Sequence, residues 1–138
     1  MRAFVDTSAL LKKYIEERGS QQLEQVLGGV SDLIVSPVTW VELNAAIARR
    51  LRGKLLTAQQ SSWVLSEAET DFRSCSQVVW GEELVEAATR MIRRHSLKTL
   101  DAIQLAAGVL SKPDLFLTSD RELFEQARKV ILKTQYIG

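Results

Sequence analysis

Short apolar runs alternate along this chain with longer stretches of helical periodicity. The clearest runs are Ala3–Val5, Leu33–Val35 and Leu115–Leu117, and Ser76–Trp80 and Val130–Leu132 are further candidates. Runs this short suit buried strands better than helices. Because strands separated by helices pair in parallel and bury both faces, the pattern predicts an α/β fold. We expect a short central parallel sheet flanked by helices on both faces.

The stretches between these runs predict the helices. The expected helices cover Ser8–Glu16, Ser20–Leu27, Ser36–Arg52, Thr57–Arg73, Glu82–Arg94, Thr99–Leu110 and Asp120–Lys129. Thr99–Leu110 is nearly all apolar, so we expect it to be buried. The chain has 138 residues and no linker, repeat or low-complexity tract. A chain of this length suits one domain, which we expect to span residues 1–138.

Composition excludes several classes of partner. The net charge is +1, so a polyanion would have to be held by local patches or by a metal, not by the overall field. The single cysteine, Cys75, can form no internal disulfide and fits a reducing compartment. No apolar run is long enough to span a membrane, and Asp6 interrupts the N-terminal apolar stretch. We therefore expect a cytoplasmic protein that does not bind membranes.

Four acidic residues lie near the expected junctions between strands and helices. Asp6 follows the first strand, and Asp120 follows the strand at Leu115–Leu117. Glu42 lies in the helix after the second strand, and Asp101 lies in the first turn of the apolar helix. In such folds the ligand crevice lies beyond the carboxyl ends of the strands. The pattern therefore predicts that these carboxylates meet at one edge of the sheet.

Each of these acids, taken alone, also fits a purely structural role. Acids in a first helical turn stabilise the helix by about 0.3–1 kcal/mol. Ser119–Glu122 and Thr39–Glu42 each have the pattern of a capping box. Asp101 fits this explanation less well, because an unpaired carboxylate among apolar residues is costly to bury.

The co-occurrence of the four acids favours a functional site. Carboxylates gathered at one edge repel one another unless they are protonated or share a cation. A ligand set made only of oxygen atoms suits Mg²⁺ or Mn²⁺. Such metals activate water and bind phosphoryl oxygens during phosphodiester cleavage. The acids therefore indicate a divalent-metal site for phosphodiester chemistry.

Four stretches carry a resemblance to a known family: FVDTSALL, SPVTWVELNAA, LKTLDAIQLAAG and FLTSDREL. In order and spacing, over nearly the whole chain, they resemble a PIN domain, and specifically the VapC-type ribonuclease toxins of prokaryotic toxin–antitoxin pairs. The resemblance implies an Mg²⁺- or Mn²⁺-dependent endoribonuclease that cleaves single-stranded RNA. It maps the catalytic and metal-binding residues to Asp6, Glu42, Asp101 and Asp120.

The same resemblance implies a cognate antitoxin protein and a homodimer. An arginine or lysine of the partner would enter the acidic pocket, with apolar anchoring from Leu10–Tyr14 and Trp40–Leu65. The chain departs from some relatives, which carry a further acid directly after the last motif aspartate. Arg121 stands there in this chain, so the number of metal ions stays open.

Other functions fit the sequence less well. A phosphatase with an aspartate nucleophile would carry a second acid where Ser8 stands, and dinucleotide binding would need a glycine-rich motif after the first strand. A catalytically inactive interaction module would not need all four acids. A PIN-domain nuclease that processes RNA and is no toxin remains the main alternative.

Three basic clusters are candidates for contact with single-stranded or structured RNA. They are Lys12-Lys13, Arg49–Lys54 and Arg93–Lys98. Phosphate contacts of this kind supply much of the affinity of nucleic-acid-binding proteins. The alternative is that these charges are solvated or complement the dipole at helix C-termini.

Overall fold

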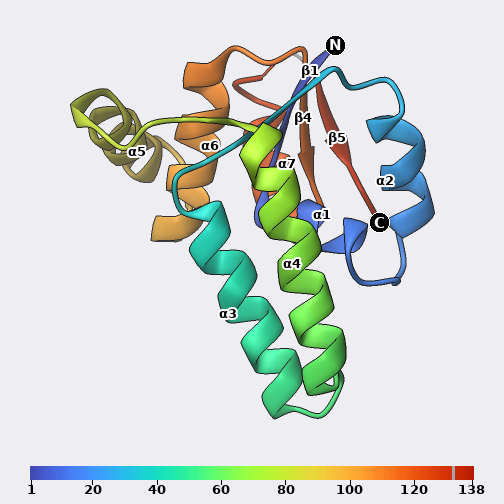
Figure 1. Ribbon diagram of the computed structural model, residues 1–138. Helices are drawn as coiled ribbons and strands as arrows, with labels where there is room; N and C mark the ends of the chain where they lie inside the picture. Colours follow the sequence, from blue (N-terminus) through green and yellow to red (C-terminus); the bar gives the residue numbers. More distant parts are fainter. Residues whose placement is uncertain (132) are drawn as a thin grey trace.

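The computed structural model describes residues 1–131 and 133–138 (Figure 1). Its centre is a five-stranded sheet in the order β3-β2-β1-β4-β5, and every strand pair is parallel. The strands are β1 (Arg2–Val5), β2 (Asp32–Val35), β3 (Ser76–Gln77), β4 (Leu115–Thr118) and β5 (Thr134–Tyr136). The predicted parallel α/β fold is confirmed.

The helices follow the expected order. They are α1 (Thr7–Leu10), the 3-10 turn η1 (Leu11–Lys13), α2 (Ser20–Leu27), α3 (Thr39–Arg52), α4 (Ala58–Ser74), α5 (Glu82–Arg94), α6 (Thr99–Ser111) and α7 (Arg121–Ala127). The bounds predicted for α2 and α5 agree with the structure. Helix α3 begins at Thr39 and not at Ser36, because the Ser36 hydroxyl accepts a hydrogen bond from Val38 N and holds a turn there.

Two strand predictions need correction. The last strand is not Val130–Leu132: β5 is Thr134–Tyr136, and Ile131 instead packs into the core behind α7. Leu132 itself lies outside the described residues. The strand expected over Ser76–Trp80 covers only Ser76–Gln77, since β3 is an edge strand that pairs with β2 alone.

Alternation of side chains along the strands gives the sheet two apolar faces. Ala3, Val5 and Leu117 face a core closed by α1–α4, whereas Phe4 and Phe116 face a second core closed by α5–α7. The rings of Phe4 and Phe116 stack with centroids 5.2 Å apart. Figure 1 shows the α3–α4 hairpin projecting beyond the carboxyl ends of the strands. Helix α3 of this hairpin forms one wall of the site described below.

Close contact with the sheet fixes the position of α6. A Cβ atom added to Gly108 would lie 2.5 Å from Cε2 of Phe116, which is too close for any side chain. Helix α6 carries Asp101 in its first turn. Gly108 therefore sets how closely the helix that carries this acid approaches the sheet.

None of the helices within the described residues is both long enough and apolar enough to cross a bilayer.

Candidate active site

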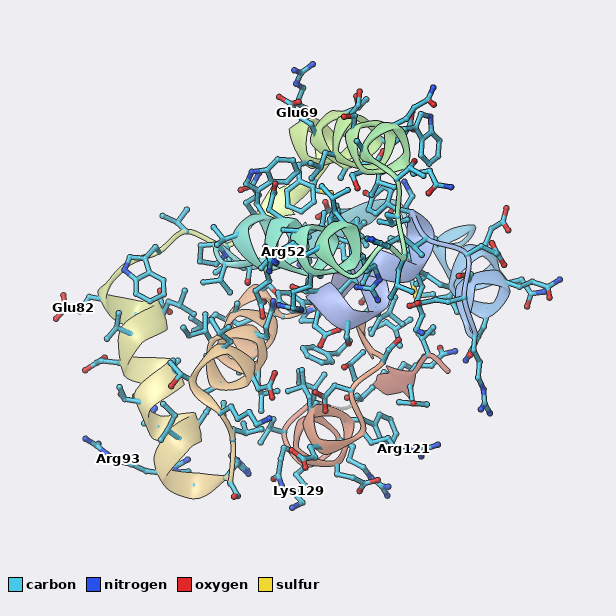
Figure 2. The ribbon with its side chains drawn as sticks, turned by 90° about the horizontal axis from the view of Figure 1, so that it is seen from below. Arg52, Glu69, Glu82, Arg93, Arg121 and Lys129 are labelled. Carbon is cyan, nitrogen blue, oxygen red and sulfur yellow. The ribbon has the colours of Figure 1, made fainter. Side chains whose placement is uncertain are left out.

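A cavity of about 390 Å³ opens at the carboxyl edge of the sheet, and all four predicted acids line it. Asp6 comes from the β1–α1 junction, Glu42 from α3, Asp101 from α6 and Asp120 from the β4–α7 junction. Figure 2 looks along the sheet onto this edge, with α1 lying between α3 and α7. Elements far apart in the sequence thus bring the four carboxylates into one place.

Asp6 is the most buried of the four acids, with 4% of its surface exposed. As the N-cap of α1, its Oδ1 accepts hydrogen bonds from Ala9 N at 3.1 Å and from the Ser8 hydroxyl at 2.7 Å. Its Oδ2 accepts one from the Thr118 hydroxyl at 3.0 Å. The donors hold the carboxylate in one orientation, with both oxygens engaged.

Burial and, to a smaller extent, the charge of Asp120 raise the pKa of Asp6 to about 7, although its three hydrogen bonds act to lower it. The pKa of Asp101 is raised to about 6 by burial and by the charges of Asp120 and Glu42. A nearby cation favours the charged form of a carboxyl group. The protein therefore has carboxylates at this edge that a bound cation would stabilise.

Glu42 is held by a buried polar network. Its Oε1 accepts hydrogen bonds from the Thr7 hydroxyl at 2.8 Å and from Gln104 Nε2 at 2.6 Å. Gln104 is 2% exposed, and its Nε2 also lies 3.0 Å from Thr7 Oγ1 and 3.3 Å from Thr39 Oγ1. The network orients Glu42 through Oε1, and Oε2 makes no hydrogen bond within the described residues, so it can bind a ligand.

Gln104 was missed in the sequence analysis. It is the one amide in the apolar run that follows Asp101, three residues further along the same helix. Residues three apart lie on one face of a helix. Gln104 could have been identified from the sequence, because it is the one amide in an apolar helix and shares a face of that helix with Asp101, a candidate metal ligand.

Asp120 caps α7, and its Oδ1 accepts a hydrogen bond from Leu123 N at 3.0 Å. The Ser8 hydroxyl accepts a hydrogen bond from Ser119 N at 3.0 Å, which joins α1 to the segment that follows β4. The Thr118 hydroxyl accepts one from Asp120 N at 3.0 Å, which closes a local turn at the end of β4. The two expected capping boxes are wrong, because Asp120 and not Ser119 caps α7, and Val38 precedes α3 without a side-chain cap.

The residues around the cavity fit a hard divalent cation. The acidic donors are all carboxylate oxygens, the type that Mg²⁺ and Mn²⁺ prefer. Two further oxygens of cavity residues, Gln104 Oε1 and Ser119 Oγ, are buried without a hydrogen-bond partner among the described residues. Within residues 1–131 and 133–138, no three acidic, histidine or cysteine side chains already converge as a ligand cluster. Coordination would therefore require carboxylates to turn inward or to bind through water.

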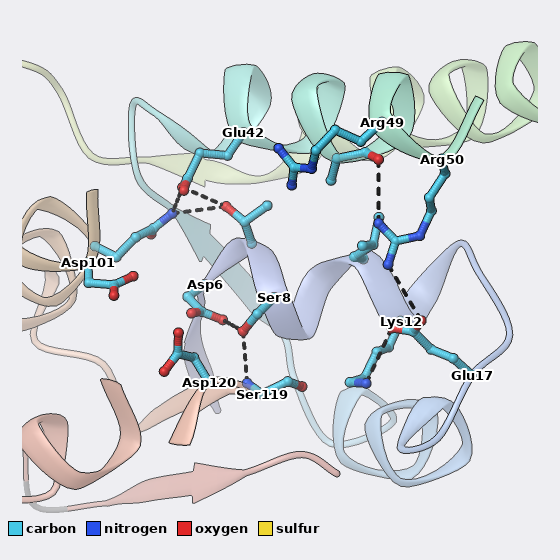
Figure 3. Close-up of a pocket in the computed structure, with 14 residues that line it drawn as sticks. Asp6, Ser8, Lys12, Glu17, Glu42, Arg49, Arg50, Asp101, Ser119 and Asp120 are labelled. Carbon is cyan, nitrogen blue, oxygen red and sulfur yellow. Dashed lines mark hydrogen bonds and ion pairs between the residues drawn. The ribbon is translucent and has the colours of Figure 1, made fainter. Parts of the chain in front are cut away.

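The other end of the cavity is basic. Lys12, Arg49 and Arg50 line it, together with Glu17 (Figure 3). Of the remaining candidates for RNA contact, Lys13 pairs with Asp71, and Arg52 is exposed at the end of α3 outside the cavity lining. The four predicted acids and the three cations thus occupy opposite ends of one cavity.

The match to a family model identifies the class of protein. The model described as the PIN domain matches residues 3–130. This span is most of the chain, so the chain belongs to the PIN-domain family. A search among curated protein sequences gave no match.

Solved structures with the same fold include proteins of toxin–antitoxin complexes. The chain is similar to a toxin–antitoxin complex from Klebsiella pneumoniae (TM-score 0.66, 18% identity, 88% of this chain and 89% of that chain covered). It is similar to FitAcB from Neisseria gonorrhoeae (TM-score 0.69, 13% identity, 96% and 95% covered). It is also similar to VapBC2 from Rickettsia felis bound to a promoter DNA fragment (TM-score 0.69, 10% identity, 98% and 99% covered). At these identities the likeness shows the fold.

Proposed function

We propose that this PIN-domain protein is a metal-dependent endoribonuclease that cleaves phosphodiester bonds in single-stranded RNA. The observation that carries the proposal is the meeting of Asp6, Glu42, Asp101 and Asp120 around one cavity. Membership of the PIN-domain family supports it. Such a site would use Mg²⁺ or Mn²⁺, since the acidic donors are carboxylates.

The four acids would divide the work according to how they are held. A bound Mg²⁺ or Mn²⁺ supplies an activated water and neutralises charge on the phosphate. Asp6 provides a ligand fixed by three hydrogen bonds, and Asp101 and Asp120 complete the set from α6 and α7. Glu42, whose Oε1 is occupied by Thr7 and Gln104, orients the attacking water through Oε2.

Cleavage assays test this function. Purified protein is incubated with labelled unstructured and structured RNAs, with Mg²⁺ or Mn²⁺ and with excess chelator. We expect cleavage that needs the metal and is lost in Asp101→Asn, whereas the exposed Glu83→Gln keeps it. Cleavage that persists in chelator or in Asp101→Asn would contradict the proposal and indicate a contaminating nuclease.

We further propose that the protein is the toxin of a toxin–antitoxin pair. The supporting observation is its structural likeness to a toxin–antitoxin complex from Klebsiella pneumoniae. The acidic end of the cavity suits an arginine or lysine from an antitoxin, which would pair with the carboxylates and displace the metal.

An apolar groove near the cavity supports the same partner. It measures about 580 Å³ and is lined by residues of two regions, Tyr14–Glu16 and Leu55–Val64. Leu55 is 76% exposed there, and Trp63 is 58% exposed. A charge pair alone seldom gives tight binding, and buried apolar anchors supply the rest. We propose that this groove takes an apolar segment of the antitoxin, and that the toxin is a homodimer in the complex.

Induced expression in a host that lacks the antitoxin tests the toxin role. Growth should arrest with the wild type and recover with Asp6→Ala or with the adjacent gene co-expressed. If the wild type leaves growth unchanged while the purified enzyme cleaves RNA, the toxin role is wrong. The protein would then be an RNA-processing nuclease.

A further inference from the structure

The three cations at the basic end of the cavity differ in how they are held. Lys12 Nζ lies 3.3 Å from Glu17 Oε1 and donates to the Arg18 carbonyl at 2.7 Å. Arg50 Nη2 lies 3.7 Å from Glu17 Oε2, and Arg50 Nη1 donates to the Ala46 carbonyl at 3.4 Å. Glu17 therefore serves as the counter-ion of both cations, and neither is fully available to a ligand.

Arg49 is different, because its guanidinium makes no ion pair or hydrogen bond within the described part of the chain. Its side chain is exposed and still lines the cavity. Arg49 follows Glu42 by about two turns of α3, so both lie on one face, about 10 Å apart along the axis. Figure 3 shows the guanidinium reaching back along α3 toward the acidic end.

Arg49 forms no ion pair with any of the four acids within the described residues. A cation in the cavity without a partner has the chemistry to bind an incoming anion. The guanidinium fork matches phosphate oxygens with two parallel hydrogen bonds.

An RNA substrate meets an electrostatic problem at this site. A bound metal would neutralise charge at the phosphate that is cut, but the four carboxylates would still repel the neighbouring phosphates of the same strand. A cation elsewhere in the same cavity would reduce that repulsion. Arg49 is such a cation.

We propose that Arg49 forms a phosphate-binding subsite, which holds an RNA phosphate next to the one that is cleaved. The subsite rests on the proposed ribonuclease function and extends it from the metal to the substrate backbone. A backbone contact positions the strand without reading its bases. Loss of Arg49 should therefore weaken binding of all single-stranded RNAs to a similar extent.

Binding measurements without turnover test the subsite. Fluorescence anisotropy of a labelled single-stranded RNA is followed in chelator over a range of salt concentrations. We expect Arg49→Gln to weaken affinity by at least about tenfold, because it removes a charge-assisted contact with two parallel hydrogen bonds to one phosphate. The slope of log affinity against log salt should fall by about 0.7, the contribution of one phosphate contact to a single strand. Arg90→Gln removes the same charge from an exposed position of α5, outside the cavity and outside the three basic clusters, and should change neither quantity.

A conservative variant and a kinetic measurement separate the outcomes. Arg49→Lys keeps the charge and loses the fork, so it should keep the salt slope and lose part of the affinity; it carries the test if Arg49→Gln does not fold. With Mg²⁺ or Mn²⁺, Arg49→Gln should raise KM far more than it lowers kcat. If a folded Arg49 variant binds RNA as tightly as the wild type does, and the wild-type protein cleaves RNA, the subsite alone is overturned. A wild type that neither binds nor cleaves RNA would overturn the proposed function, and the subsite with it.

Discussion

The four acids of the cavity form two pairs that are held in different ways. Asp6 and Glu42 receive hydrogen bonds from side chains of three elements, through Ser8, Thr118, Thr7 and Gln104. Asp120 accepts a hydrogen bond from one backbone amide, and Asp101 accepts none within the described residues. The first pair is thus oriented before any ligand arrives, and the second pair is free to adjust. In such a site, two carboxylates already have a fixed orientation, and the other two can turn toward a cation when it binds.

The largest effect should come from the fixed carboxylate itself. Asp6→Asn removes the charge at nearly constant volume. A loss of function would therefore reflect the loss of a metal ligand and not a packing defect. Loss of one supporting partner of a metal ligand typically costs 10–100-fold, and loss of the ligand should cost more than about 100-fold in cleavage rate. Initial rates at saturating Mn²⁺ measure this. A variant within a few-fold of the wild type would show that Asp6 only caps α1.

Removing a donor to the fixed pair should have the next largest effect. Thr118→Val deletes the hydroxyl that binds Asp6 Oδ2 and keeps the shape of the side chain. We expect metal affinity to fall by about 10–100-fold. Titration calorimetry with Mn²⁺ measures this, and the exposed Thr89→Val is the matched control. Equal Mn²⁺ affinities of Thr118→Val and Thr89→Val would show that the hydrogen bond to Asp6 does not matter for metal binding, which contradicts the distinction between fixed and adjustable acids.

The position of the adjustable pair depends on the packing of α6. Gly108→Ala forces the helix away from Phe116, and overpacking of this kind costs about 1–3 kcal/mol. Denaturant unfolding should show this loss of stability. Helix α6 carries Asp101 and also Gln104, which holds Glu42, whereas the partners of Asp6 lie on α1 and β4. Because Asp6 keeps its hydrogen bonds, metal affinity should fall less than in Thr118→Val. A larger fall than in Thr118→Val would mean that the acids positioned by α6 contribute more to metal binding than the fixed Asp6.

The smallest effect concerns the pH dependence of stability. Above about pH 4 the unfolded chain has released the protons that the folded, metal-free protein keeps on Asp6 and Asp101. Raising the pH from about 4 to about 7 therefore favours the unfolded state. In chelator, Tm should fall by on the order of 5 °C between about pH 5 and pH 7.5. Asp6→Asn should remove most of this fall, whereas a wild-type Tm independent of pH would contradict the raised pKa of Asp6.

The sequence contains enough information to predict the parallel sheet and the meeting of the four acids, because apolar runs ending at acids specify strand ends. It does not show how each acid is held. Gln104 reaches Glu42 from another helix, a contact that depends on how α6 packs against the sheet. The shift of the last strand to Thr134–Tyr136 also escaped prediction, since these polar, half-buried residues give no apolar run on an edge strand.

Direct measurement of metal binding tests the central claim, that this cavity is a divalent-cation site built on a fixed aspartate. Titration calorimetry compares Mg²⁺ and Mn²⁺ binding to the wild type and to the Asp6→Asn/Asp101→Asn double variant, with circular dichroism to verify folding. We expect saturable binding to the wild type with release of protons near neutral pH, since the raised pKa values leave protons for the metal to displace. We expect no measurable binding to the folded double variant. Equal binding to both proteins would show that these two aspartates are not metal ligands.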